Sequence, residues 1–179
     1  MKIAAISGSL RAGSSNTAVL RAAARLAPAG VEIIPFEGIA GLPFFNPDLD
    51  GDDVPAPVRA MRELIGGVDG LLISSPEYAR GVAGVLKNAL DWLVGSHEFP
   101  DKPVALINTS PRATHALAAL TLTLETMSAR LATEACVTLP LLGGAWDEHG
   151  IAADPALAEP LRSAVERFAA FIRTVQAGA

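Results

Sequence analysis

Hydroxyl, amide and guanidinium side chains are concentrated near the start of the chain, where together they could bind an anion. Hydroxyls and amides offer hydrogen-bond donors, and a guanidinium presents a forked cation that matches phosphate oxygens. Small residues between them let backbone N–H groups point toward the same ligand. An ordinary strand-to-helix turn with a Ser or Asn cap is the simpler alternative. Nine positions supply Ser9, Arg11, Ser14, Ser15, Asn16 and Thr17, and this concentration favours a phosphate site.

Two common phosphate motifs do not fit this loop. In G-x-x-x-x-G-K-[ST], Gly8 and Gly13 match the outer glycines, but Ser14 stands where the phosphate-gripping lysine belongs. In G-x-G-x-x-G, Leu10 occupies the second glycine position, and its side chain would block a pyrophosphate. A nucleoside triphosphate site and a dinucleotide fingerprint are therefore disfavoured. The loop suits a terminal monophosphate.

The elements around this loop alternate between strand and helix. Apolar runs bounded by turn residues predict five strands, at residues 3–6, 31–35, 70–74, 104–107 and 135–139. Helical spacing of apolar residues predicts five helices, at residues 17–26, 57–65, 82–93, 116–131 and 155–175. Segments 36–57 and 143–154 are expected to be irregular. This alternation indicates an α/β fold with parallel strands joined by right-handed crossovers.

A second informative stretch begins directly after the predicted strand 70–74. Open α/β sheets bind ligands at the carboxyl ends of their strands. Here Pro76 and Gly81 shape a loop in which Tyr78 offers a flat aromatic face and a hydroxyl. Trp92, in the helix beyond, is expected to pack in the core or at a subunit contact. The strand 104–107 also ends in a turn of small residues, which includes Ser110.

Length and composition limit the possible functions. At 179 residues, half of them apolar and with mean hydropathy +0.36, the chain is expected to form one domain over residues 1–179. The net charge of −5 and the scattered arginines give little support for nucleic-acid binding. No apolar run approaches about 18 residues, so no membrane span is expected.

Cysteine and acidic residues also bear on compartment and metal binding. The single cysteine, Cys136, excludes an internal disulfide and is expected to be a buried, inert thiol in a reducing cytosol. Ser7 and Arg11 interrupt the N-terminal apolar run too early for a secretory signal, so a cytoplasmic protein is expected. The acidic segment 48–53 fails the calcium-loop template, and no metal site is predicted.

The stretches GSLRAGSSNT and SPEYARGVAGVLKNALDWL closely resemble the NAD(P)H-dependent FMN reductase family, which includes quinone, azo and chromate reductases. The likeness implies a flavodoxin-like three-layer sandwich with a five-stranded parallel sheet that binds FMN noncovalently. It matches the first stretch to the phosphate and the second to the isoalloxazine ring. The cofactor-binding candidates are Ser9, Arg11, Ser14, Ser15, Asn16, Thr17, Pro76, Glu77, Tyr78, Ala79 and Ser110.

The resemblance also implies an activity. NADPH or NADH would deliver hydride to FMN N5, and electrons would pass to a small-molecule acceptor that is quinone-like, an azo compound, a metal oxyanion or free flavin. The flavin carries the chemistry, so no protein acid, base or nucleophile is predicted. A homodimer or homotetramer is expected. The alternatives are a flavin-binding electron carrier or sensor without turnover, and a non-catalytic interaction protein that has lost its flavin.

Three departures from the family pattern affect the predicted site. Ala79 replaces the usual Asn, and Ala83 stands where the family has Pro. The third loop, expected to carry several glycines, instead contains Pro111, Arg112 and His115. Their bulk lies where close backbone approach to the flavin is expected. Arg112 is an alternative contact for the extra phosphate of NADPH, and His115 is a candidate polar residue at a helix start.

Overall fold

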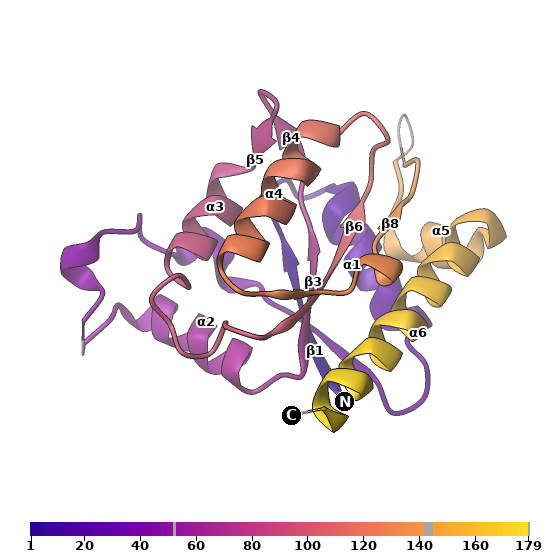
Figure 1. Ribbon diagram of the computed structural model, residues 1–179. Helices are drawn as coiled ribbons and strands as arrows, with labels where there is room; N and C mark the ends of the chain where they lie inside the picture. The colour runs from indigo at the N-terminus through magenta and orange to yellow at the C-terminus, as the bar shows by residue number, and fades with distance from the viewer. Residues whose placement is uncertain (52, 142–144, 179) are drawn as a thin grey trace.

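Parallel strands form the central sheet of the computed structural model, which describes residues 1–51, 53–141 and 145–178. The order across the sheet is β2-β1-β3-β6-β7, and β8 also pairs with β6 (Figure 1). Every pairing in this sheet is parallel. The strands are β1 (Lys2–Ser7), β2 (Glu32–Pro35), β3 (Gly70–Ser74), β6 (Pro103–Asn108), β7 (Arg130–Leu131) and β8 (Val137–Thr138).

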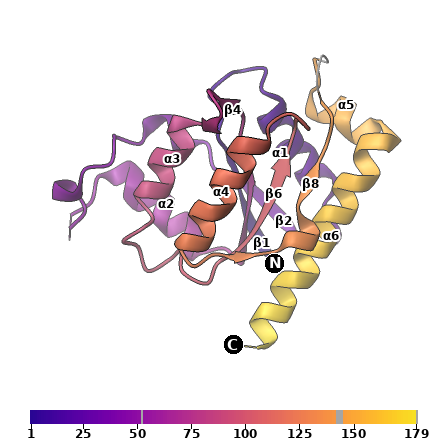
Figure 2. The same cartoon turned by 45° about the horizontal axis from the view of Figure 1, so that its top comes forward.

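Helices cover both faces of this sheet, as Figures 1 and 2 show. One face carries α1 (Ser15–Leu26), α5 (Glu148–Ala153) and α6 (Pro155–Ala177). The other carries α2 (Ala56–Gly66), α3 (Gly84–Asp91) and α4 (Thr114–Thr126). Every residue of β3 and β6 is therefore buried, as expected for continuous apolar strands between two helix layers. The predicted three-layer α/β sandwich is confirmed.

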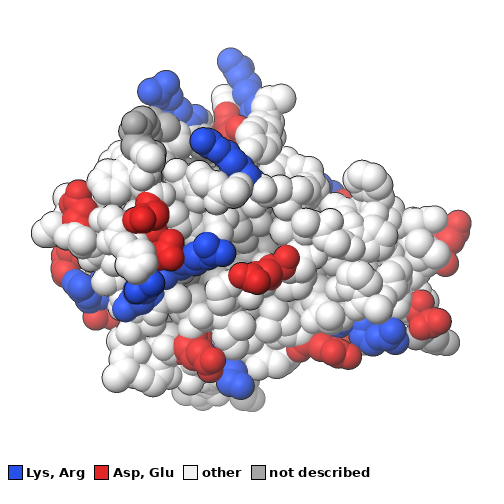
Figure 3. Space-filling model, turned by 180° about the vertical axis from the view of Figure 1, so that it is seen from behind, with Lys and Arg blue, Asp and Glu red and all other residues white. Residues whose placement is uncertain are grey.

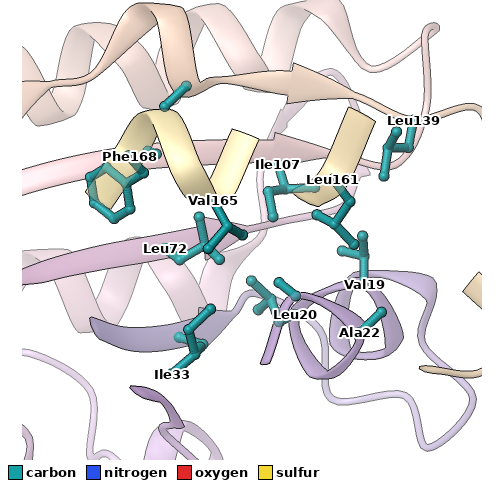
Figure 4. Close-up of a cluster of buried hydrophobic side chains, with 14 of the residues drawn as sticks. Val19, Leu20, Ala22, Ile33, Leu72, Ile107, Leu139, Leu161, Val165 and Phe168 are labelled. Carbon is teal, nitrogen blue, oxygen red and sulfur yellow. The ribbon is translucent and has the colours of Figure 1, made fainter. Parts of the chain in front are cut away.

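The long C-terminal helix packs directly on the sheet. Figure 4 shows Leu161, Val165 and Phe168 of α6 facing Leu72 and Ile107 of the strands. The three helix residues follow the i, i+4, i+7 spacing of an apolar stripe. The helix predicted over residues 155–175 is thus confirmed, and its C-terminal end lies two residues later, at Ala177. The buried apolar stripe of α6 shields one face of the sheet from solvent.

The fourth predicted helix is wrong at its end, and the fifth predicted strand is interrupted. Helix α4 ends at Thr126, and Ser128 adopts a left-handed φ of 63° that turns the chain into β7. The short helix η3 (Thr133–Ala135) then separates β7 from β8. β7 and β8 pair in turn along β6, so together they take the place of the fifth strand.

Both segments predicted to be irregular contain short elements. Segment 36–57 includes the 3₁₀ helices η1 (Gly38–Gly41) and η2 (Pro47–Leu49) and the start of α2, while its Asp52 lies outside the described residues. Segment 143–154 contains α5, begun by an Asp147 cap on Gly150 N–H at 2.7 Å, and its residues 143 and 144 lie outside the described ranges. Short helices of this kind lack the periodicity that a longer window would reveal.

Trp92 anchors the segment before α2 to the end of α3. Its side chain is fully buried, and its indole N–H donates to the Pro43 carbonyl at 2.8 Å. Phe45 meets the indole edge-on with ring centroids 5.1 Å apart. Asn88 donates to the same carbonyl and accepts from the Phe45 N–H. The prediction that Trp92 packs in the core is confirmed.

We expect Gly70→Ala to destabilise the fold by about 1–3 kcal/mol. A Cβ at this position would lie 2.8 Å from Ile172 Cδ1 and 2.9 Å from Phe168 Cζ, which would push α6 off the sheet. Urea unfolding measures the change. Gly84→Ala is the matched control, because its Cβ would meet nothing within 4 Å. Equal stabilities of the two variants would contradict the packing of α6.

Candidate functional site

Three loops leave the carboxyl ends of β1, β3 and β6 at the same edge of the sheet, which comes forward in Figure 2. We call them loop 1 (residues 8–13), loop 2 (75–83) and loop 3 (109–113). Loops 1 and 2 touch at Gly8, where a Cβ would lie 2.5 Å from Ser75 Oγ. Only glycine allows this approach. The Gly8 N–H also donates to the Ser74 carbonyl at 2.8 Å.

Asn16, in the first turn of α1, joins this helix to the ends of two strands. Its Oδ1 accepts from Ser74 Oγ at 2.9 Å and from Thr109 Oγ1 at 3.2 Å. All three side chains are buried, with Asn16 only 6% exposed. Within the described ranges, Asn16 Nδ2 has no hydrogen-bond partner. The carboxamide therefore fixes three chain segments through its oxygen and leaves its NH₂ group as a donor for a ligand.

A pocket of about 290 Å³ lies between these loops, beside Asn16. We call it the carboxyl-edge pocket. It is lined by Asn16, Ser75, Pro76, Glu77, Asn108, Thr109, Ser110, Arg112 and Ala113. Its lining combines amide and hydroxyl groups with one guanidinium and one carboxylate, so it suits a polar organic group. Its position at the carboxyl ends of neighbouring parallel strands is the usual ligand site of an open α/β sheet.

Loop 1 leads into a helix whose N-terminus is open to an anion. Ser14, rather than Asn16, is the cap: its Oγ accepts from the Thr17 N–H at 3.4 Å. The Thr17 hydroxyl lies 2.8 Å from Ser7 Oγ. No acidic residue occupies the first turn of α1. The positive end of the helix dipole and its free N–H groups are therefore available to a negative ligand.

Loop 2 contains a short β-hairpin with a two-residue turn, which the sequence pattern did not predict. Strands β4 (Glu77–Tyr78) and β5 (Gly81–Val82) pair antiparallel. The turn residues Ala79 and Arg80 have φ values of 50° and 60°. Left-handed pairs of this kind favour Asn and Gly, and an L-residue such as alanine is strained there. The family's Asn at position 79 would thus suit the turn as well as the ligand.

Glu77 connects loop 2 to the start of α4. Its Oε2 accepts from the Ala116 N–H at 2.9 Å, in the first turn of that helix. The N-cap residue of α4, Ala113, provides no side-chain cap, and His115 is exposed. Glu77 therefore supplies the missing cap from another loop, and its charge complements the helix dipole. The polar-cap role expected for His115 falls to Glu77 instead.

The predicted cofactor residues do not all line one cavity. Asn16, Pro76, Glu77 and Ser110 line the carboxyl-edge pocket. Ser9, Arg11 and Thr17 line a second hollow on the β2 side of loop 1, and Ser14 shares a smaller one with Thr17. Ser15, Tyr78 and Ala79 line none of these, and Tyr78 is 59% exposed. Pocket-lining residues not predicted as cofactor contacts are Ser75, Asn108, Thr109, Arg112 and Ala113, and the polar ends of the apolar runs could have indicated the first three.

The departures in loop 3 leave the pocket open. Pro111, Arg112 and His115 are all exposed, while Ala113 is buried and small. Arg112 lines the rim of the pocket and has no carboxylate partner within the described residues. Figure 3 shows basic side chains projecting at the upper edge of a face that is otherwise of mixed charge. Pro111 and His115 therefore lie outside the pocket lining, and only Arg112 of these three residues borders the pocket.

Cys136 contributes nothing to this edge of the sheet. Burial raises the pKa of its thiol, and its Sγ accepts from the Leu106 N–H at 3.3 Å. A thiol with a raised pKa is a poor nucleophile at neutral pH, which agrees with the inert role expected from the sequence. Over residues 1–51, 53–141 and 145–178, no cluster of three or more His, Cys, Asp or Glu side chains could hold a metal ion.

The donors at this edge fit a flavin mononucleotide. Asn16 Nδ2 is an unpartnered donor on a side chain that is more than nine-tenths buried. The acid-free start of α1 and the Arg11 guanidinium suit a phosphate, and Gly13 leaves open space where a Cβ would stand. The hairpin of loop 2 offers backbone edges beside the pocket for a flat ring. Each part of such a ligand thus has matching chemistry within the same three loops.

Comparison with known proteins identifies the family. The model for "NADPH-dependent FMN reductase" matches residues 1–147. The chain belongs to this family. It is 43% identical over 112 residues to an NAD(P)H-dependent FMN reductase of Pseudomonas aeruginosa, covering 62% of this chain and 60% of that protein. A 2-hydroxy-1,4-benzoquinone reductase of a Burkholderia species is 45% identical over 113 residues, 62% of this chain and 61% of the relative.

Solved structures agree with the flavodoxin-like fold of the FMN reductases. The flavoenzyme NAD(P)H:(acceptor) oxidoreductase of Paracoccus denitrificans matches with a TM-score of 0.78 and 29% identity, covering 97% of both chains.

The sequence matches above span only 60% and 61% of the two curated reductases. In the described part of the chain, no helix combines the length and apolarity that crossing a bilayer requires.

We expect Ala79→Gly to stabilise the protein by about 1 kcal/mol, because glycine removes the steric cost of the left-handed φ at the hairpin turn. Thermal unfolding measures the effect. Ala29→Gly, in the exposed turn after α1, is the control and should be neutral or slightly destabilising, since Ala29 has no positive φ. A loss of stability in Ala79→Gly would mean that the hairpin has another geometry.

We expect Glu77→Ala to lower the free energy of unfolding by about 0.5–2 kcal/mol, the usual cost of a lost helix cap. The Ala116 N–H would lose its acceptor, and loop 2 would separate from α4. Chemical denaturation and amide hydrogen exchange at Ala116 provide the measurements. Glu77→Gln keeps an acceptor oxygen and should lose less. Unchanged exchange at Ala116 in the alanine variant would exclude the cap.

Proposed function

We propose that this chain is an FMN-dependent NAD(P)H oxidoreductase acting on quinone-like acceptors. The observation that carries the proposal is the carboxyl-edge pocket, where Asn16 joins the start of α1 to Ser74 of β3 and Thr109 of loop 3 and still offers a free amide donor. Family membership supports the same cofactor and donor. The two curated relatives are named as reductases of FMN and of a benzoquinone, so the acceptor class proposed here follows theirs.

The phosphate of FMN would be held at the start of α1. Backbone N–H groups of the first turn and the hydroxyls of Ser9, Ser14 and Ser15 donate to its oxygens, with Thr17 beside them. Arg11 adds a charge-assisted contact, which is stronger than a neutral hydrogen bond. The α1 dipole stabilises the same negative charge, since no acidic side chain opposes it. These residues bind and orient, and none of them exchanges a proton.

The ring system would lie along loop 2. One side of the ring-binding position would be formed by Pro76, Glu77, Tyr78 and Ala79 of loop 2. Part of the other side would be formed by Ser110 of loop 3. Bound FMN supplies hydride acceptance from a nicotinamide and electron delivery to the acceptor. The chain's own part is positional: the Glu77 cap keeps loop 2 against α4, and the Tyr78 ring, which is exposed here, would cover one edge of the bound ring.

Arg11→Ala should weaken FMN binding roughly 10- to 150-fold, the equivalent of losing about 1.5–3 kcal/mol from a charge-assisted phosphate contact. Flavin fluorescence titration of the purified protein gives the dissociation constant. Arg167→Ala, on the exposed face of α6, is the matched control and should bind FMN normally. Equal affinities of the two variants would place the phosphate elsewhere.

Turnover separates the proposal from its alternatives. FMN-loaded protein should oxidise NADPH or NADH when a benzoquinone is supplied, as followed at the nicotinamide absorbance band. An electron carrier or sensor would bind FMN yet fail to accept hydride from either nicotinamide. An interaction protein without flavin would not bind FMN at all. Either result would overturn the proposed oxidoreductase.

We further infer that the chain forms a homodimer, or a homotetramer built from it, through the surface beside α3. Phe44 is 89% exposed and Val94 is 65% exposed. Hydrogen bonds from Asn88 and Trp92 to the Pro43 carbonyl hold the neighbouring Phe44 next to α3. Figure 1 shows the segment before α2 projecting beyond α2 and α3. Large exposed apolar side chains on one flank are typical of a subunit contact.

Phe44→Asp should therefore shift the assembly toward monomer, because the charge would be desolvated in the contact. Light scattering coupled to size exclusion gives the mass. Leu122→Asp on the exposed face of α4 is the control, since Leu122 is 65% exposed on another surface. A monomeric wild type, or equal masses of wild type and Phe44→Asp, would refute this contact.

We also propose a cytoplasmic location. A chain with one cysteine cannot form an internal disulfide, which is typical of proteins in a reducing compartment. The proposed enzyme also requires a nicotinamide donor in the compartment where it is located. Fractionation of the native host, with detection of the chain in the cytosolic fraction, tests the location, and recovery outside that fraction would contradict it.

A further inference from the structure

Loop 3 places one arginine at the rim of the carboxyl-edge pocket. Arg112 is exposed and lines the pocket together with Ser110 of the same loop. Its backbone N–H donates to Ser110 Oγ at 3.2 Å, and the Ala113 N–H donates to the Ser110 carbonyl at 3.0 Å. Asn108 Oδ1 accepts from the Ser110 N–H at 3.2 Å, which ties this turn to the end of β6. The Arg112 side chain therefore extends from a backbone position that hydrogen bonds hold beside Ser110.

The two charged side chains that line this pocket differ in how their charges are compensated. Glu77 accepts from the Ala116 N–H at 2.9 Å, so its carboxylate is compensated by the positive end of the α4 dipole. Arg112 has no carboxylate partner among the described residues. A guanidinium does not lose its proton in proteins, so its charge is available to a ligand. The rim of the pocket thus offers an uncompensated cation in a chain whose net charge is −5.

The position of Arg112 decides which ligand can use this charge. Ser110, to which its backbone N–H donates, borders the proposed position of the flavin ring, whereas the flavin phosphate is assigned to the start of α1. The 2′-phosphate of NADPH lies at the adenosine end of the dinucleotide, remote from the nicotinamide that must meet the ring. A small acceptor must instead lie against the ring itself. A substituent on that acceptor therefore reaches the rim where Arg112 lies.

We propose that Arg112 binds an anionic substituent, a sulfonate or a carboxylate, on a quinone acceptor. This inference rests on the proposed function and adds to it the charge class of the acceptor, with Arg112 as the residue that selects it. The planar, forked guanidinium matches the paired oxygens of either group.

The contact acts on binding rather than on the chemical step. The quinone ring takes up one hydride equivalent, which comes from the nicotinamide donor, and one proton from solvent, and it leaves as the hydroquinone. The anionic substituent keeps its charge throughout. Because its contact with Arg112 is the same before and during reduction, this contact lowers the acceptor concentration needed for half-saturation and leaves the limiting rate unchanged.

Reoxidation of the FMN-loaded protein tests Arg112 with no nicotinamide present. The protein is reduced with dithionite and mixed in a stopped-flow instrument with 1,4-naphthoquinone-2-sulfonate or with neutral 1,4-naphthoquinone. Arg112→Ala should raise the half-saturating concentration of the sulfonate about fivefold, the size expected of an exposed ion pair, and should leave that of the neutral quinone unchanged. Arg112→Lys should keep part of the wild-type affinity. The effect should shrink in about 1 M salt, which screens exposed charges.

Arg80→Ala is the matched control. Arg80 lies in the turn of the loop 2 hairpin, is exposed and does not line the pocket, so its replacement removes the same charge from the same edge and should affect neither quinone. Binding alone gives a second readout. 2-Naphthalenesulfonate, which is not an electron acceptor, should bind the oxidised FMN-loaded protein about fivefold more weakly in Arg112→Ala, as followed by the flavin absorbance spectrum. The neutral 2-naphthalenesulfonamide should bind both proteins equally.

Three results would overturn the assignment. The first is an equal effect of Arg112→Ala on the charged and the neutral quinone, including no effect on either. The second is an equal effect of Arg112→Ala and Arg80→Ala on the charged quinone. The third is slower reduction by NADPH in Arg112→Ala with unchanged reoxidation, which would assign Arg112 to the donor. Failure of the proposed function has a different signature, because wild-type protein would then bind no FMN or oxidise neither nicotinamide.

Discussion

The buried carboxamide of Asn16 is the contact on which the arrangement of the site depends. One oxygen accepts from hydroxyls at the ends of β3 and just beyond β6, so the start of α1 cannot move independently of either strand. A buried acceptor that lost these partners would carry a desolvation cost, which makes the arrangement all-or-none. Packing alone would not specify it, because the apolar contacts of α1 are tolerant of small shifts along the sheet. The polar node therefore sets the register between helix and sheet at the edge where a ligand binds.

Loop 2 is held at the same edge of the sheet by different interactions. Gly8 lets loop 1 touch Ser75, and Glu77 reaches the first turn of α4, so the hairpin is held at its base on two sides. Its tip has no such support and carries two consecutive left-handed residues. Strain at a tip whose base is fixed is sustained by the surrounding structure, and such strain is common beside ligand sites. The rigid base and strained tip give loop 2 a defined but adjustable edge toward a ring.

The sequence predicted the sheet, the helix layers and the loops of the site, because apolar periodicity reports directly on burial. It could not predict features created by tertiary contacts. The Glu77 cap joins residues 39 positions apart, and no local pattern near Thr114 reveals an acceptor supplied from another loop. The split fifth strand follows from the left-handed turn at Ser128 and the short helix η3, whose few residues have no measurable period. Pro111 and His115 were expected to obstruct the pocket because the sequence does not show that both are exposed and lie outside its lining.

The division of the anion-binding residues between two pockets has a geometric cause. Successive residues on an α-helix are rotated by about 100°, so neighbours in sequence face different directions. Asn16 lines the carboxyl-edge pocket, whereas Thr17, one residue later, bonds Ser7 and lines the second hollow, on the β2 side of loop 1. A cluster of polar residues across a helix start is thus distributed around that start rather than gathered in one cavity. Loop 1 separates the two pockets, and its Arg11 lines the one on the β2 side.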